Sequence, residues 1–188
     1  MPRLRVFAEL ASTMDEALAH PPETVVLALR QTAGVGRTGP WQSTPGSLHC
    51  TFVTRRFDLT HVAVAAARLL GAALKWPNDL LLPGGKCGGV LEHQAGGVGY
   101  VGLGVNLVPV PDFATARWDA GPRDLAERVY REALGVRDGE YRALCGMLGR
   151  AFTIGTVVDV VGGVLLVEQE GTVRAASEVT SARQLVGV

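Results

Sequence analysis

Apolar and polar residues follow two different periods along the chain, and these periods predict strands and helices. Strand-forming residues, mainly valine, leucine and phenylalanine, are concentrated in four runs: 3–9, 24–31, 47–57 and 98–110. Apolar residues recur at helical spacing in three longer segments: 58–74, 123–134 and 139–152. Ser12 is typical of an N-cap and predicts a further short helix over residues 13–20. The chain therefore combines strands with packed helices.

Glycine and proline mark the connections between these elements. Residues 33–47 contain four glycines and two prolines without any period, which predicts a loop, and residues 111–122 form a second loop. Residues 80–82 and 86–94 predict a hairpin around a Gly-Gly turn. From residue 153 onward, short apolar runs alternate with Gly-Gly and Glu-Gly turns, which predicts a small β unit that is not stable alone. We therefore predict two domains, 1–152 and 153–188.

Length, composition and charge narrow the class of protein. The chain has 188 residues, 47% hydrophobic and 19% charged, which is enough for one full core and a small additional unit. Eighteen basic residues balance 18 acidic ones, so net charge does not support a general role on nucleic acid or membrane surfaces. No apolar run approaches the roughly 18 residues of a membrane-spanning helix. The first ten residues also lack the apolar stretch of a secretory signal, so we expect a cytoplasmic protein.

Cysteine and histidine spacing gives no metal or disulfide pattern. The cysteines are widely spaced, without a Cys-x-x-Cys pair: Cys50, Cys87 and Cys145. This favours free thiols in a reducing compartment over a disulfide framework or a zinc site. The histidines also lack metal-ligand spacing, and no role is assigned to them: His20, His49, His61 and His93.

Lysine and asparagine are scarce, and the few that occur lie close together. The chain has 16 arginines but only two lysines and two asparagines. All four scarce residues fall within 32 positions: Lys75, Asn78, Lys86 and Asn106. Because lysine is a compact, flexible point charge that arginine does not replicate, this stretch is a candidate site.

The segment Gly34 to Gly39 spells Gly-x-Gly-x-x-Gly after a strand. A dinucleotide-binding turn would have to open a helix whose N-terminus holds the pyrophosphate. Here Pro40 and Trp41 follow, and no helical period begins until residue 58, so we reject that interpretation. Two interpretations stay open: a flexible surface loop, or a glycine loop that closes over a phosphate-bearing ligand with Arg37 as its cation.

The segment Lys75 to Asp79 reads Lys-Trp-Pro-Asn-Asp and lies between a predicted helix and a predicted strand. A helix stop would explain the lysine and the proline but would leave the other three residues unexplained. In residues 84–92 a phosphate-loop motif fails, because Cys87 stands where serine or threonine is required.

Glycines also interrupt two apolar strands. Gly88 and Gly89 weaken their strand unless a ligand or another backbone comes close, and the same holds for residues 102–106. Ser12 and Thr13 form either an ordinary helix cap or a pair of hydroxyls that contact a ligand.

Taken in order, these motifs resemble the catalytic domain of biotin–protein ligases. The family pattern has Ser-Thr, Gln, a glycine–arginine loop, Trp, Lys-Trp-Pro-Asn-Asp, a Gly-Lys-x-Gly-Gly hairpin and Gly-x-Gly-x-Asn. The matching segments are Ser12-Thr13, Gln31, Gly34 to Gly39, Trp41, Lys75 to Asp79, Lys86 to Glu92 and Gly102 to Asn106. The resemblance covers about residues 1–150 and implies an α/β fold with a mixed, largely antiparallel sheet and packed helices. Residues 153–188 resemble the family's small SH3-like domain.

The resemblance implies an AMP-forming ligase with ATP and biotin as substrates and Mg²⁺ as cofactor. The implied biotin-binding residues are Ser12, Thr13, Gln31, Gly34, Arg37, Lys86, Gly88, Gly89 and Gly104. The implied ATP-binding residues are Arg37, Trp41, Lys75, Asn78, Lys86 and Asn106. The implied catalytic residues are Arg37, Lys86 and Asp79, and Asp79 would organise either Mg²⁺ or the neighbouring lysines. Fixed cations suit this reaction, because a carboxylate must approach a phosphate of the same charge.

Two positions depart from the family pattern. Val35 stands where the family usually has the first arginine of the loop, and Pro40 lies in a segment that is usually basic and one residue longer. We therefore expect the loop to hold the ATP phosphates and the adenylate less tightly, without loss of activity.

The resemblance also implies partners. The expected acceptor is the biotin carboxyl carrier domain of a biotin-dependent carboxylase. Longer relatives carry an N-terminal helix-turn-helix, whereas this chain begins at the first catalytic strand, so we expect no binding to DNA; we also expect none to membranes. A homodimer stays open. Three alternatives remain: a lipoate or octanoate ligase or transferase of the same superfamily, a non-catalytic biotin-binding protein, and an interaction module built on the small β unit.

Overall fold

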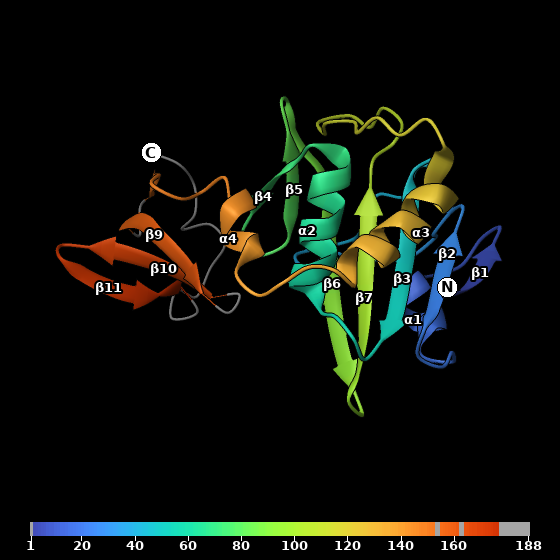
Figure 1. Cartoon of the computed structure of the whole chain (residues 1–188). Helices are drawn as coiled ribbons and strands as arrows, with labels where there is room; N and C mark the ends of the chain where they lie inside the picture. Colours follow the sequence, from blue (N-terminus) through green and yellow to red (C-terminus); the bar gives the residue numbers. More distant parts are fainter. Residues whose placement is uncertain (1, 153–154, 162–163, 177–188) are drawn as a thin grey trace.

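The computed structural model describes residues 2–152, 155–161 and 164–176, which form two β-sheets and four helices (Figure 1). The larger sheet has seven strands in the order β1-β2-β3-β7-β6-β5-β4. Their bounds, in chain order, are β1 Arg3–Phe7, β2 Thr24–Ala28, β3 Leu48–Thr54, β4 Ala73–Lys75, β5 Asp79–Leu82, β6 Gly85–Ala95 and β7 Val98–Val105. Only β1 and β2 pair in parallel, and every other pair in this sheet is antiparallel. The predicted mixed, largely antiparallel α/β fold is confirmed.

The helices cover the two faces of this sheet unequally. Their bounds are α1 Thr13–Ala17, α2 Leu59–Leu70, α3 Gly121–Ala133 and α4 Glu140–Leu144. Side chains alternate between faces along a strand, so Val25 and Phe52 join the main core with α2 and α3, whereas Val26 and Val53 pack with Ala17 of α1. The face with α1 is therefore only partly covered, which leaves room for a site over β3, β7 and β6.

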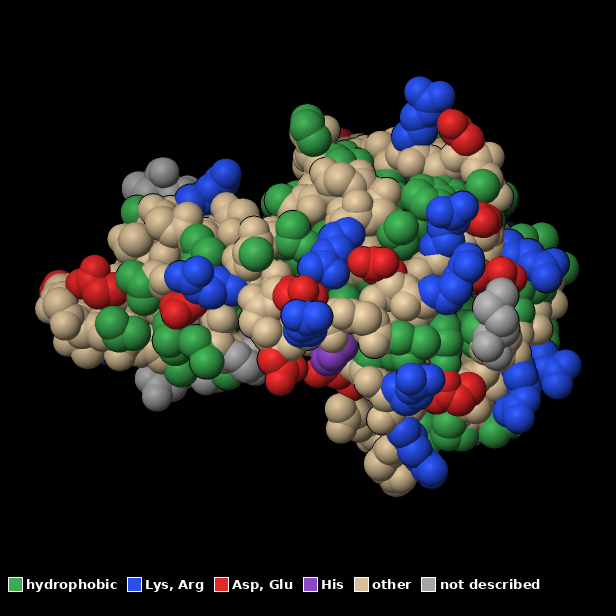
Figure 2. All heavy atoms as spheres, viewed as in Figure 1, with side chains coloured by type: hydrophobic (Ala, Val, Ile, Leu, Met, Phe, Trp, Pro, Cys, Tyr) green, Lys and Arg blue, Asp and Glu red, His purple; other side chains and the backbone are tan. Residues whose placement is uncertain are grey.

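The outer surface of α2 and α3 is polar. Figure 2 shows basic and acidic side chains interspersed over it. Several are paired along the helices, as in Arg128–Asp124 and Arg123–Glu127. In the described part of the chain, no helix is long and apolar enough to span a bilayer.

Helix α2 is shorter than predicted. It begins after Asp58, whose carboxylate accepts from the N–H groups of Thr60 and His61, and it ends at Gly71 in the left-handed conformation with φ 64°. The prediction that the helix continues to residue 74 was wrong, because the left-handed glycine redirects the chain into β4. Lys75 therefore lies in a strand and pairs with Asp79 of β5 across the turn.

The last predicted helix was also wrong over most of its length. The sequence predicted residues 139–152, but α4 contains only Glu140–Leu144. Gly149, with φ 73°, lies in the turns that follow, and β8 (Ala151–Phe152) comes next. Smaller differences occur elsewhere: the four predicted strands and α1 end two to five residues earlier, and α3 begins at Gly121 instead of residue 123.

The second sheet has four strands in the order β11-β10-β9-β8, with bounds β9 Gly155–Val161, β10 Val164–Gln169 and β11 Thr172–Ala175. Its apolar residues Val157 and Leu165 belong to the same core cluster as the large sheet. Strand β8 precedes the predicted domain boundary yet pairs with β9. The division at residue 152 stays a prediction, and residues 177–188 of the predicted SH3-like unit lie outside the described residues.

Candidate functional site

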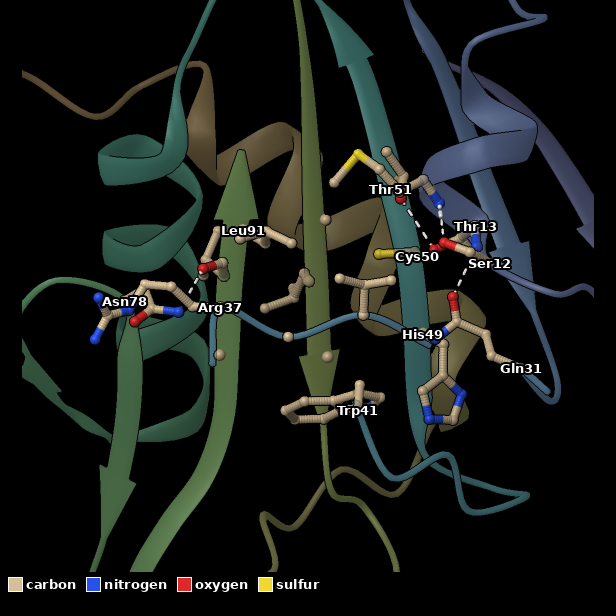
Figure 3. Close-up of a pocket in the computed structure, with 18 of the residues that line it drawn as sticks. Ser12, Thr13, Gln31, Arg37, Trp41, His49, Cys50, Thr51, Asn78 and Leu91 are labelled. Carbon is tan, nitrogen blue, oxygen red and sulfur yellow. Dashed lines mark hydrogen bonds between the residues drawn. The ribbon is translucent and has the colours of Figure 1, made fainter. Parts of the chain in front are cut away.

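Two adjoining cavities lie on the partly covered face of the large sheet, and Figure 3 shows the residues that line the inner one. The inner cavity, about 60 Å³, is lined by side chains and glycines from α1 and from β3, β6 and β7, including Thr13, Thr51, Gly89 and Gly104. The outer cavity, about 400 Å³, is bordered by Lys75, Asp79, Asn106, Val110 and Phe113. Five residues line both: Gly36, Arg37, Trp41, Asn78 and Lys86. The two cavities therefore form one continuous site with a cationic junction.

Hydroxyl and amide groups form the closed end of the inner cavity. Ser12 caps α1 by accepting from the N–H of Met14 over 3.2 Å. The N–H of Thr13 donates to Oε1 of Gln31 over 2.7 Å, and the Thr51 hydroxyl donates to the Thr13 hydroxyl over 2.9 Å. This network fixes the orientation of the polar groups before any ligand arrives, and it suits a ligand with a compact polar head.

The glycine loop folds into a narrow hairpin above the sheet. The N–H of Trp41 donates to the carbonyl of Gly34, and that of Gly36 donates to the carbonyl of Gly39, both over 2.8 Å. The Trp41 indole then lies over β7, where a Cβ at Gly104 would be 2.5 Å from Cζ2 of Trp41. Ligand pockets usually measure about 300–1,000 Å³. The inner cavity by itself is smaller than this range, and Trp41 and its loop form part of its wall.

Lysine side chains and one carboxylate form ion pairs at and beside the junction between the cavities. Nζ of Lys86 lies 2.6 Å from Oδ1 of Asp79 and 5.9 Å from the centre of the Trp41 ring. Nζ of Lys75 lies 3.8 Å from Oδ2 of the same carboxylate. Asp79 is therefore placed between both lysines, and Arg37 lines both cavities.

A protein-held Mg²⁺ does not fit these residues. Both oxygens of Asp79 face lysine ammonium groups, and Mg²⁺ prefers free carboxylate or water oxygens in octahedral geometry. Across residues 2–152, 155–161 and 164–176, no group of three or more His, Cys, Asp or Glu side chains could hold a metal ion. The Asp79 carboxylate therefore pairs with two lysines, Lys75 and Lys86, instead of offering free oxygens to a metal ion.

The two asparagines are buried and anchor the backbone around the site. Nδ2 of Asn78 donates to the carbonyl of Val90 over 2.9 Å, and the N–H of Val90 returns a bond to the carbonyl of Asn78. The main chain of Asn106 bonds to Cys87 and Ala116. Asn78 therefore fixes the 75–79 turn against β6 with its own side chain.

A family model supports the resemblance that the motifs indicated. The model of the biotin/lipoate A/B protein ligase family matches residues 10–106, more than half of the chain. The chain belongs to this family. The matched region contains the polar end, the glycine loop, the lysines and both asparagines of the site.

Two curated proteins of this family are similar in sequence. The biotin–[acetyl-CoA-carboxylase] ligase of Paracoccus denitrificans is 37% identical over 146 residues, covering 62% of this chain and 60% of that protein. The ligase of the same name from Mycobacterium tuberculosis is 28% identical over 197 residues, covering 84% of this chain and 74% of its own. The match to the Paracoccus protein thus leaves about two fifths of that protein's length uncovered.

A solved structure of a biotin protein ligase from Aquifex aeolicus, in complex with biotin and ATP, has the same fold. It superimposes with a TM-score of 0.75 and 22% identity, and the match covers 93% of this chain and 95% of that one. At this identity the likeness establishes the fold alone.

Most of the residues that the sequence singled out come together in this family member. The inner cavity or the junction contains Ser12, Thr13, Gln31, Arg37, Trp41, Asn78, Lys86, Gly89 and Gly104. The outer cavity adds Lys75, Asp79 and Asn106. Their individual roles toward biotin and ATP stay predictions.

Two predicted biotin-binding glycines do not line either cavity. A Cβ at Gly88 would lie 2.7 Å from the carbonyl oxygen of Gly104, so this glycine permits close packing of β6 on β7. A Cβ at Gly34 would lie 2.9 Å from Nε2 of Gln31, so Gly34 makes room for that side chain. Both glycines shape the family's site without facing the ligand space.

Several residues that no motif singled out also line the inner cavity, among them His49 and Thr51. These two residues alternate along β3 with Leu48, Cys50 and Phe52 of the core, so the period of two contained the signal that they share the opposite face. His49 is only 1% exposed, and burial lowers its pKa to about 4 against the weaker opposing effect of a hydrogen bond with the Ala28 backbone.

Proposed function

We propose that this chain is an ATP-dependent biotin–protein ligase. It activates biotin to biotinyl-5′-AMP and then transfers biotin to a lysine of a biotin carboxyl carrier domain. The observation that carries the proposal is the continuous site, in which a narrow cavity with a polar end meets a wider cavity at Arg37 and Lys86. The names of the curated relatives support biotin as the acid and the acetyl-CoA carboxylase carrier as the acceptor.

The first step joins biotin and ATP at the junction. We assign the bicyclic head of biotin to Ser12, Thr13 and Gln31, with its tail along Gly89 and Gly104. A biotin carboxylate oxygen attacks the α-phosphorus of ATP, the bond to the β-phosphate bridging oxygen breaks, and pyrophosphate leaves. Arg37 and Lys86 line both cavities and face the point where negative charge is concentrated. Their fixed positive charge reduces the repulsion between carboxylate and phosphate and stabilises the transition state.

The outer cavity fits the remainder of the nucleotide. We assign adenine contacts to Trp41 and Asn106, and phosphate contacts to Lys75. Asn78 acts mainly by holding the turn, because its amide is already bonded to Val90. Asp79 is a positioning residue for the two lysines, and we propose that Mg²⁺ reaches the site held by the ATP phosphates and water.

The second step releases AMP. The neutral Nζ of the acceptor lysine attacks the acyl carbon of the adenylate, an amide bond forms, and the bond from the acyl carbon to the phosphate oxygen breaks. The mixed anhydride is sensitive to water, so the 34–41 hairpin must cover it until the acceptor arrives. The wider outer cavity leaves the approach that an acceptor lysine needs.

Biotin-dependent ATP–pyrophosphate exchange tests the proposal, with lipoate and octanoate as competing acids. We expect exchange with biotin alone, and loss of about a hundred-fold or more in Lys86→Ala, since a charged group facing the transition state is removed. Arg117→Ala is the matched control, because this arginine is a surface cation with 89% of its side chain exposed and lies outside both cavities.

Either of two results would overturn the proposal. Exchange with lipoate or octanoate in preference to biotin would assign the chain to the lipoate branch of the family. Biotin binding without exchange with any acid would show a binding protein whose altered loop no longer supports chemistry.

A further inference from the structure

Unsatisfied polar atoms are concentrated in the inner cavity. Among the described residues, three buried side-chain nitrogen or oxygen atoms lack a hydrogen-bond partner of standard geometry: Nε1 of Trp41 and both ring nitrogens of His49. The Ala28 backbone interacts with the imidazole, but only weakly and outside that geometry. Both residues line the inner cavity. Buried polar groups are nearly always paired in proteins, and an unpaired one is costly, so a concentration of them at one cavity points to a bound polar molecule.

The position of His49 fits a ligand contact. Strand β3 pairs His49 with Gly104 of β7 and Thr51 with Gly102, so both side chains rise from the same face beside bare glycine backbone. Thr51 already belongs to the polar network through its bond to Thr13. Figure 3 shows the imidazole below Gln31 and beside Trp41.

The charge state of His49 fits an uncharged ligand head. Burial holds its pKa at about 4, so the ring is neutral at physiological pH. A neutral imidazole presents one N–H donor and one nitrogen acceptor. A cyclic urea, with a carbonyl acceptor and two N–H donors, can bond to either nitrogen, whereas an alkyl chain or a dithiolane ring has no group for them.

We propose that His49 is a specificity-determining residue that hydrogen-bonds the polar ring of the bound acid and so favours a ureido head over alkyl and dithiolane heads. This inference rests on the proposed function and names a further residue of its acid-binding site. Without a ligand the buried imidazole has no hydrogen-bond partner of standard geometry. With the acid bound, it becomes satisfied, and only an acid with a polar head provides that gain.

Two other roles for His49 are weaker. A metal-ligand role has no support, because the described residues contain no group of three or more His, Cys, Asp or Glu side chains that could hold a metal ion. A purely structural role would rely on the hydrogen bond with the Ala28 backbone, whose effect on the pKa of His49 is smaller than that of burial. In that case, replacing the ring by an apolar group would destabilise the unliganded protein.

Calorimetric binding of biotin and of octanoic acid to the wild type, His49→Leu and His49→Gln tests the inference, together with thermal melting of each unliganded protein. In His49→Leu we expect biotin binding to weaken about ten-fold or more, with octanoic acid bound equally well or better. Its unliganded melting temperature stays equal to or exceeds that of wild type, since a buried unsatisfied group has been removed. His49→Gln, which retains a donor and an acceptor, restores most of the preference for biotin.

The outcomes separate the two proposals. A wild type that binds no biotin would overturn the proposed function, and the role of His49 with it. A wild type that binds biotin, with His49→Leu binding it equally tightly, would overturn the role of His49 alone. A His49→Leu protein that fails to fold, melts lower, or loses both acids in parallel would show a structural residue and also overturn the inference.

Discussion

At the scale of single residues, the site depends on a few charges at one junction. Lys86 and Lys75 share the carboxylate of Asp79, and Arg37 is the one cation contributed by the described hairpin of residues 34–41. Val35, where related ligases usually have arginine, is 58% exposed and also lines the inner cavity. A side chain at this position can therefore reach the ligand space without disturbing the core.

An arginine at position 35 should strengthen binding of the adenylate. In Val35→Arg we expect release of biotinyl-5′-AMP to slow by roughly ten-fold, because a hydrogen bond from a charged group contributes about 1.5–3 kcal/mol. Rapid-dilution measurement of adenylate release checks this. Val35→Met is the control for side-chain length without charge, and an equal effect of both variants would contradict the electrostatic explanation.

The buried His49 makes stability depend on pH in a defined window. Its pKa is 6.5 in the unfolded chain and about 4 in the folded one, so between these values the unfolded state binds a proton that the folded state does not. The free energy of unfolding should therefore be highest above pH 6.5 and fall as the pH approaches 4, by about 3 kcal/mol at most.

Urea unfolding of the unliganded protein between about pH 7 and pH 4.5 measures this dependence. His49→Leu lacks the titrating group and should lose less stability over the same interval. Identical losses in the two proteins would show that other groups cause the acid sensitivity.

At the scale of elements, glycines allow a loop and two strands to approach one another. Gly88 lets β6 lie close to β7, and Gly104 leaves the space over β7 that the indole of Trp41 occupies. The hairpin of residues 34–41 is closed by its own main-chain hydrogen bonds, so it forms a small rigid cover. The hairpin and Trp41 therefore form one wall of the inner cavity.

Adding one methyl group under Trp41 should impair the site. The Cβ of Gly104→Ala would lie 2.5 Å from the indole, which must shift, and we expect biotin binding to weaken about ten-fold while the protein stays folded. Titration with biotin, followed by calorimetry, measures the loss. Gly99→Ala on the same strand meets only ordinary contacts at 3.5 Å and should bind within about two-fold of wild type. Equal binding by both variants would mean that Trp41 is free to move at no cost.

At the scale of the whole molecule, the two sheets share one core. Val157 and Leu165 of the second sheet belong to the cluster that includes Leu74 of the large sheet. The chain between them is tied to both: the N–H of Gly146 donates to Leu74, and the hydroxyl of Tyr141 donates to Pro77 in the turn that carries the site. The second sheet is therefore connected to the 75–79 turn through α4 and the residues that follow it.

A shared core predicts a single unfolding transition. Leu165 is completely buried, and Leu165→Ala leaves a cavity that costs about 2–5 kcal/mol, which lowers the melting temperature by roughly 5–15 °C. Tryptophan fluorescence reports on the large sheet, since all three tryptophans lie before residue 119, and circular dichroism reports on the whole chain. In Leu165→Ala, the melting temperatures measured by fluorescence and by circular dichroism should fall by the same amount.

Val161→Ala provides the matched control, because this valine lies in the same sheet but is 57% exposed. It should leave the melting temperature nearly unchanged. Two separate transitions in Leu165→Ala, with the fluorescence transition unmoved, would show that the sheets unfold independently.

The sequence by itself determined the family, the mixed sheet and most of the site, because these depend on local patterns. The period of two along residues 47–57, the loop glycines and the clustered Lys75, Lys86, Asn78 and Asn106 are all visible without coordinates. Tertiary structure decided what depends on neighbours distant in the chain. It ended α2 at Gly71 and made Lys75 part of a strand, since β5 offered a pairing edge.

The same distinction applies to single residues. Gly88 resembled a ligand contact because its strand is apolar, whereas in the fold a side chain at this position would meet the backbone oxygen of Gly104 on the neighbouring strand. His49 belongs to no sequence motif. It lines a cavity that α1, the 34–41 hairpin and three strands form together, so only the folded structure reveals its position in the site. Burial, pairing and charge state are properties of the assembled fold, so local sequence alone could not assign them.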